Sequence, residues 1–267
     1  MILYRYYWVY KFIIIAIITR RINMIRLILI AIFLILFLVC SIPILLVEWI
    51  IGKYNMDLKN RSSLAIVTWA FNVIIWLTGA KVDYIGLENV PKEGSVLYIG
   101  NHRSFFDIVL TYVKVPHACG YIAKKEMEKV PLLNLWMRNL HCLFLDRTDI
   151  KAGLKTILEA IKQAKEGISI CIFPEGTRSK VEGELLPFHD GSFKIAQKAG
   201  CPIVPMTILN TAEIFENHFP WIKKAHVIIE YGKPIYIKEL EPENQKQIGS
   251  YVQNIIRETY DKNKDNI

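Results

Sequence analysis

The sequence predicts an α/β fold, a central mixed sheet covered by helices, preceded by an N-terminal membrane-inserting helical segment. Two observations carry this prediction. From about Lys81 onward, short apolar runs alternate with stretches of helical periodicity, as in sheets covered by helices. Before Lys81 the chain is strongly apolar, which accounts for a mean hydropathy of +0.26 over the whole chain. We therefore expect a membrane-anchoring region at 1–80 and a second domain at 81–267.

The N-terminal apolar segment is long enough to insert in a bilayer. The residues from Leu27 to Val47 carry no charge, and a helix of that length spans about 31 Å, close to the hydrocarbon thickness. The aromatic residues between Tyr4 and Tyr10 have the composition of an interfacial belt. A cleaved signal peptide is disfavoured because Val47-Glu48-Trp49 offers no small-residue cleavage site.

The remainder of the chain predicts strands separated by helices. Apolar runs favour strands at 95–99, 119–123, 142–145, 168–173, 203–208 and 226–231. Helical patterns follow at 105–113, 132–140, 150–165, 192–199 and 244–261. The helix at 150–165 is the clearest, since its apolar residues make one face. In such sheets, functional groups lie on the loops at strand ends.

One such loop carries the sequence Asn101-His102-Arg103-Ser104-Phe105-Phe106-Asp107. On a single helix His102 and Asp107 would lie about 140° apart, so they can cooperate only across a turn. Ser104 is a good N-cap, which would leave His102 in the loop and Asp107 in the first helical turn. The carboxylate could then orient the imidazole as a general base. Alternatively, Ser104 and Asp107 form only a capping box.

A second motif, Phe173-Pro174-Glu175-Gly176-Thr177-Arg178-Ser179, follows another apolar run. Together, NHRSFFD and FPEGTRS resemble the paired motifs of the glycerolipid acyltransferase family, specifically the bacterial 1-acyl-glycerol-3-phosphate acyltransferases. Their order and separation also match, and the resemblance covers roughly residues 80 to 235. It implies that His102, oriented by Asp107, removes the proton from the free hydroxyl of a lysophosphatidic acid. The alkoxide would attack an acyl thioester of coenzyme A or acyl carrier protein, giving phosphatidic acid.

Three basic residues are candidates for binding the substrate phosphate. Lys124 and Lys125 match lysines that the family carries in its second motif, although a solvated surface pair is the alternative. Arg178 can bind phosphate through two hydrogen bonds, and Gly176 lets backbone amides approach an anion. We expect the substrate-binding turn Glu175, Gly176 and Thr177 to order this site or to bind glycerol hydroxyls.

The orientation of the anchor depends on two conflicting arguments. Five basic residues and no acidic ones precede Leu27, so a single span would place the second domain outside the cell. The substrates that the resemblance implies are cytoplasmic. Pro43 with Ser41 could break the segment, and Ser63 to Leu77 is a second apolar stretch. We favour a hairpin or in-plane pair that keeps the domain on the cytoplasmic face of the plasma membrane.

Composition weighs against several other classes of protein. No CxxC or HExxH pattern suggests a metal, and the P-loop, GxGxxG and GxSxG are absent, so we expect no metal and no cofactor. The widely spaced cysteines indicate core packing in a reducing compartment. The net charge of +8 fits anionic membrane lipids better than nucleic acid, because no recognition motif interleaves basic and aromatic residues.

Two alternatives to lysophosphatidic acid acylation stay open on the sequence. One is an acyltransferase of the same fold acting on glycerol-3-phosphate or another lysolipid. The other is a membrane-anchored anion-binding protein without catalysis, in which His102 and Asp107 serve only the fold.

Overall fold

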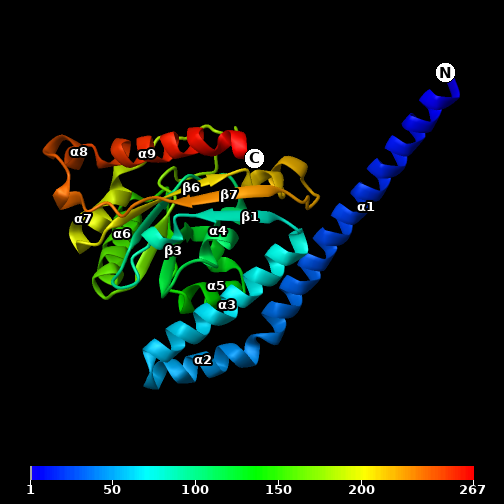
Figure 1. The fold of residues 1–267 in the computed structure, drawn as a ribbon. Coiled ribbons are helices and arrows are strands. Elements are labelled where there is room, and N and C mark those ends of the chain that lie inside the picture. The colour runs from blue at the N-terminus through cyan, green and yellow to red at the C-terminus, as the bar shows by residue number, and fades with distance from the viewer. Residues whose placement is uncertain (1) are drawn as a thin grey trace.

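The computed structural model describes residues 2–267, and within residues 1–17 it describes side chains only at Lys11 and Ile14. The aromatic belt expected between Tyr4 and Tyr10 lies outside the described side chains. The chain begins with three helices, α1 (Ile2–Cys40), α2 (Ile42–Tyr54) and α3 (Met56–Thr78). Figure 1 shows α1 projecting beyond the remainder of the molecule and α3 running back between α1 and the sheet.

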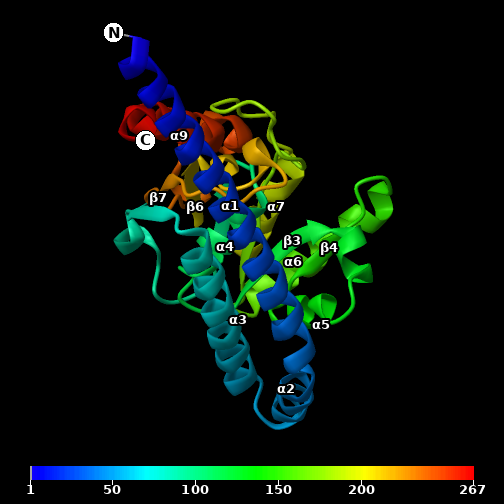
Figure 2. The same cartoon turned by 90° about the vertical axis from the view of Figure 1, so that its right-hand side faces the viewer.

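The long apolar run is broken where the sequence predicted a break. The helix α1 ends at Cys40, Ser41 donates its hydroxyl to the Leu38 carbonyl, and Pro43 lies in the first turn of α2. Asn55 then caps α3, which returns alongside α1. Two segments, Ile18–Cys40 and Met56–Thr78, are long and apolar enough to cross a membrane. Figure 2 shows α2 joining α1 and α3 at the end of the molecule away from the N-terminus.

The described residues form a mixed sheet with the order β1-β7-β6-β2-β5-β3-β4. All neighbouring pairs are parallel except β6 and β7, which are antiparallel. The strands are β1 (Lys81–Ile85), β2 (Leu97–Gly100), β3 (Cys119–Lys124), β4 (Leu143–Leu145), β5 (Ser169–Ile172), β6 (Ile203–Leu209) and β7 (His226–Tyr231). The mixed sheet confirms the predicted fold class. The strand β2, which directly precedes the motif that begins at Asn101, lies at the centre of the sheet.

Helices cover both faces of this sheet. They are α4 (Phe105–Tyr112), α5 (Leu133–Asn139), α6 (Ile150–Lys165), α7 (Lys194–Ala199), α8 (Pro242–Lys246) and α9 (Ile248–Asn263). Helices α3, α4 and α5 lie on one side, and α9 lies on the other (Figure 1). The strand β2 contributes to both cores, since Tyr98 packs with Leu110 on the first side and Leu97 packs with Ala160 on the second. Burial on both faces explains its uninterrupted apolar sequence.

The N-terminal helices are docked on the sheet domain through α5. Trp136 in α5 is buried and donates its indole N–H to Ser41 Oγ over 2.8 Å. The Trp136 ring also stacks on Phe37 of α1, with ring centroids 5.7 Å apart. Within the helical pair, Ser63 of α3 donates a 2.9 Å hydrogen bond to the buried carboxylate of Glu48 in α2. The N-terminal helices therefore have a defined position relative to the sheet domain.

Candidate active site

The loop between β2 and α4 brings His102 and Asp107 together. Ser104 has an extended backbone and caps α4 by accepting from the Phe106 amide, so the chain turns between the two residues. The imidazole Nδ1 lies 2.7 Å from Asp107 Oδ2, as the spacing predicted. The Asp107 side chain is fully buried, whereas the His102 side chain keeps 16% of its surface exposed. One member of the pair is thus shielded and the other can be reached.

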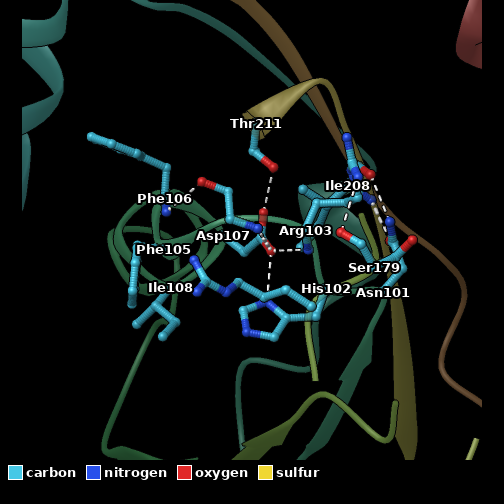
Figure 3. A network of polar contacts seen from close by, with 12 residues as sticks. Asn101, His102, Arg103, Phe105, Phe106, Asp107, Ile108, Ser179, Ile208 and Thr211 are labelled. Carbon is cyan, nitrogen blue, oxygen red and sulfur yellow. Dashed lines mark hydrogen bonds and ion pairs between the residues drawn. The ribbon is translucent and has the colours of Figure 1, made fainter. Parts of the chain in front are cut away.

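Asp107 is held by four donors, which settle the tautomer of His102. Its Oδ2 accepts from the backbone amides of Arg103 (2.7 Å) and Ser104 (2.8 Å) as well as from Nδ1. Its Oδ1 accepts from the Thr211 hydroxyl. Because a carboxylate only accepts, Nδ1 carries the proton and Nε2 keeps a free lone pair. Figure 3 shows the second imidazole nitrogen pointing away from Asp107.

A stacking contact on one face of the imidazole also fixes its orientation. The Phe173 ring stacks on it with centroids 4.3 Å apart and an interplanar angle of 11°. The loop that carries His102 is tied to β6 by Asn101, whose side-chain amide exchanges two 2.8 Å hydrogen bonds with the Ile208 backbone. Phe173, directly after β5, therefore fixes the plane of the ring, and the Ile208 backbone in β6 fixes the loop that carries it.

The second motif orders the loop of the first. Glu175 is buried and accepts from the His102 amide (2.9 Å) and the Leu186 amide (3.1 Å). Burial raises the pKa of this carboxyl to about 7, against an ordinary value of 4.5. Gly176 has a φ of +68°, a conformation that glycine adopts without strain. Thr177 is exposed on the same turn. Through Glu175 this turn contacts the loop that carries His102, and its binding of substrate stays a prediction.

The predicted phosphate-binding residues lie in separate places. Arg178 forms an ion pair with Glu216 (2.9 Å) and lies over the Phe105 ring, with its guanidinium carbon 4.0 Å from the centroid. Among the described residues no hydrogen bond or ion pair joins it to Lys124 or Lys125. Lys124 pairs instead with the neighbouring Glu126 and Lys125 with Asp146. The three cations are therefore not preassembled into one cradle.

Several residues of the site were not predicted from the sequence. Thr211 and Glu216 follow β6 and belong to neither motif, so only the folded chain brings them to α4. Phe173 stands inside the second motif, but its stacking on His102 depends on the pairing of β2 with β5. No group of three or more histidine, cysteine or acidic side chains that could hold a metal occurs in the part of the chain that the structure describes.

The arrangement can remove a proton from a bound hydroxyl. The His102 side chain is partly exposed and its ring is oriented by a buried carboxylate. The amide at the start of α4 and the Arg178 guanidinium both bond to Glu216. A positioned proton acceptor of this kind is suited to a substrate that supplies its own nucleophile.

The protein contains an acyltransferase domain, because residues 81–209 match the family model described as Acyltransferase. The 1-acyl-sn-glycerol-3-phosphate acyltransferase of Borreliella burgdorferi is 30% identical over 199 residues, covering 73% of this chain and 78% of that protein. The enzyme of the same name from Haemophilus influenzae is 30% identical over 223 residues, covering 83% and 90%. This chain belongs to the 1-acyl-sn-glycerol-3-phosphate acyltransferase family.

The fold is shared with a solved structure. The crystal structure of the 1-acyl-sn-glycerophosphate (LPA) acyltransferase PlsC from Thermotoga maritima superposes with a TM-score of 0.77 at 22% sequence identity. The match covers 91% of this chain and 97% of that one, so it includes the N-terminal helices as well as the sheet.

Proposed function

We propose that this protein transfers an acyl chain from acyl-CoA or acyl-ACP to the free sn-2 hydroxyl of 1-acyl-glycerol-3-phosphate, giving phosphatidic acid for phospholipid biosynthesis. The observation that carries the proposal is the 2.7 Å contact between His102 Nδ1 and a buried Asp107, in a family whose named members acylate this acceptor.

The chemistry needs one base and no protein nucleophile. His102 Nε2 takes the hydroxyl proton as the alkoxide oxygen attacks the thioester carbonyl, and the Asp107 carboxylate stabilises the imidazolium that forms. The tetrahedral intermediate collapses, the carbon–sulfur bond breaks, and the leaving thiolate takes the proton back from His102. A new ester and a free thiol result, so atoms and charge balance without a cofactor.

Arg178 is the proposed main contact for the acceptor phosphate. It lies at the N-terminus of α4, which carries Asp107, and a bidentate guanidinium contact would fix the distance from phosphate to hydroxyl. In this proposal Lys124, at the end of β3, and Lys125, directly after it, contribute once they leave their ion pairs. The exposed pair of Lys124 with Glu126 costs little to break. Glu175, Gly176 and Thr177 shape the turn.

In this proposal residues 1–80 anchor the protein in the membrane and residues 81–267 form the catalytic domain. Two helices apolar enough to cross a bilayer support this division, and α3 connects directly to β1. The catalytic domain would face the cytoplasm, where acyl thioesters are available, and the partners would be membrane lipids, not nucleic acid.

A single assay tests the function. Purified protein in mixed micelles is incubated with labelled acyl-CoA or acyl-ACP and, in parallel, with lysophosphatidic acid, glycerol-3-phosphate or a lyso-aminolipid. We expect labelled phosphatidic acid only with lysophosphatidic acid, and none with His102→Ala. Product with glycerol-3-phosphate alone would replace the proposed acceptor, and no product with any acceptor would leave an anion-binding protein.

A further inference from the structure

Arg178 does not stand alone at the proposed phosphate site, because a carboxylate holds it in place. Glu216 lies in the short helical turn Glu216–His218, remote in sequence from both motifs. Its Oε1 accepts from Arg178 Nη1 over 2.9 Å, and its side chain is only 22% exposed. An ion pair with this degree of burial is screened less than a surface pair.

The same carboxylate is bound to the start of α4. Its Oε1 also accepts from the backbone amide of Phe105 (2.8 Å), and its Oε2 accepts from the Ser104 hydroxyl (2.7 Å). These donors are the capping residue and the first residue of the helix that carries Asp107. Glu216 therefore joins the guanidinium of Arg178 to the backbone that positions the His102–Asp107 pair.

The guanidinium is fixed in plane as well as in position. Phe105 lies under it, with 4.0 Å between the guanidinium carbon and the ring centroid. Only Nη1 has a hydrogen-bond partner among the residues that the structure describes. The remaining N–H groups, on Nε and Nη2, are available, and their geometry matches two phosphate oxygens.

We infer that Glu216 is a positioning residue for the acceptor phosphate: it holds Arg178 against the N-terminus of α4 so that a phosphate bound to the guanidinium keeps a fixed register with His102. The inference rests on the proposed function and adds to it the residue that aligns the phosphate-binding arginine. A free arginine side chain would have to lose its rotamer freedom at each binding event, and Glu216 removes that cost in advance.

The test compares Glu216→Ala and Glu216→Gln with wild type, using lysophosphatidic acid and an acyl thioester as separately varied substrates. Loss of a charged hydrogen-bonding partner should raise KM for lysophosphatidic acid by roughly tenfold or more. We expect a smaller fall in kcat and little change in KM for the thioester. The glutamine variant should lie between wild type and alanine, because its amide oxygen still accepts from Arg178 or from the helix start.

Glu213→Ala is the matched control, since Glu213 lies on the same segment but bonds to His218 and Asn217 instead of Arg178. It should leave both KM values near wild type. A double-mutant cycle asks whether Glu216 acts through the arginine: in an Arg178→Ala background, Glu216→Ala should add little to KM. Thermal unfolding of every variant shows whether the fold is retained.

Three results would overturn the inference. An unchanged KM for lysophosphatidic acid in a folded Glu216→Ala would remove the positioning role, and a lowered KM would mean that the carboxylate competes with the phosphate. Fully additive effects with Arg178→Ala would mean that Glu216 acts elsewhere. In each case wild type is active, so the proposed function survives. A wild type without lysophosphatidic acid acylation would instead overturn both.

Discussion

At the scale of single residues, Asp107 combines two tasks in one carboxylate. It completes the capping box of α4 through the Ser104 amide, and it binds Nδ1 of His102 through the same oxygen. The capping box and the histidine–carboxylate contact that the spacing predicted are therefore both present. Because the helix start and the imidazole share one acceptor, the direction of the ring is defined by the backbone itself.

His102→Ala should lower acyl transfer by about a hundredfold to ten-thousandfold, the usual contribution of a general base. The variant should stay folded, because the side chain donates a single hydrogen bond and lies at the edge of the core. Turnover and thermal unfolding are measured together. His117→Ala, which removes a histidine bonded to Ser169 on another loop, is the control. Retention of more than about a tenth of the wild-type rate would contradict the role of base.

Glu175 should make the stability of the fold depend on pH. Its pKa is raised by burial from 4.5 to about 7, so the folded chain binds this proton more tightly than the unfolded chain. The resulting stabilisation is complete below about pH 4.5 and is lost as the pH rises through about 7. The Tm of wild type relative to Glu175→Gln should therefore fall between about pH 5 and pH 8. Parallel Tm curves for the two proteins would refute this.

The residues that sequence reasoning found and missed differ in one physical respect. His102, Asp107 and Ser104 interact across one local turn, so spacing and capping chemistry predict their contact. Glu216 and Thr211 reach α4 only because β6 lies next to β2 in the sheet. A contact that depends on the order of strands in the sheet produces no local sequence pattern, so it cannot be predicted from a single sequence.

At the scale of elements, the Ser41 break matters because it is also a docking point. The residue that interrupts the apolar helix accepts the Trp136 hydrogen bond from α5, inside the core.

The strand β1 was not predicted, because a five-residue edge strand with exposed ends has no continuous apolar run. The helix α6 matched its predicted bounds, since a long amphipathic period is a strong local signal.

Trp136→Phe tests the docking of the anchor. The substitution keeps an aromatic ring against Phe37 but removes the indole donor, leaving Ser41 Oγ without it. A buried neutral hydrogen bond of this kind contributes about 1 kcal/mol, which corresponds to a Tm lower by about 2–4 °C in a chain of this size. Trp76→Phe, at a ring that is 78% exposed, should leave the Tm in detergent unchanged. Equal Tm values for Trp136→Phe and Trp76→Phe would show that the hydrogen bond from Trp136 to Ser41 does not stabilise the docking of the N-terminal helices.

At the scale of the whole molecule, attachment should depend on apolar insertion rather than on charge. Once inserted, the segments Ile18–Cys40 and Met56–Thr78 would contribute far more to membrane affinity than the attraction of basic side chains to anionic lipid. Concentrated salt or carbonate should therefore leave the protein in the membrane pellet, and detergent should release it. Replacing Arg20 and Arg21 by glutamine should lower affinity for anionic vesicles without changing this extraction pattern. Full release by salt alone would exclude insertion.

The position of β1 in the sheet also has a consequence for the order of events on the ribosome. The strand β1 follows α3 directly, yet its partner is β7, near the other end of the chain, with Lys81 opposite His226. Contacts between such distant segments form late. The apolar helices leave the exit tunnel long before the edge of the sheet can close. We therefore expect the apolar helices to meet lipid first during biosynthesis, and the sheet domain to complete its folding on a chain that is already attached to the membrane.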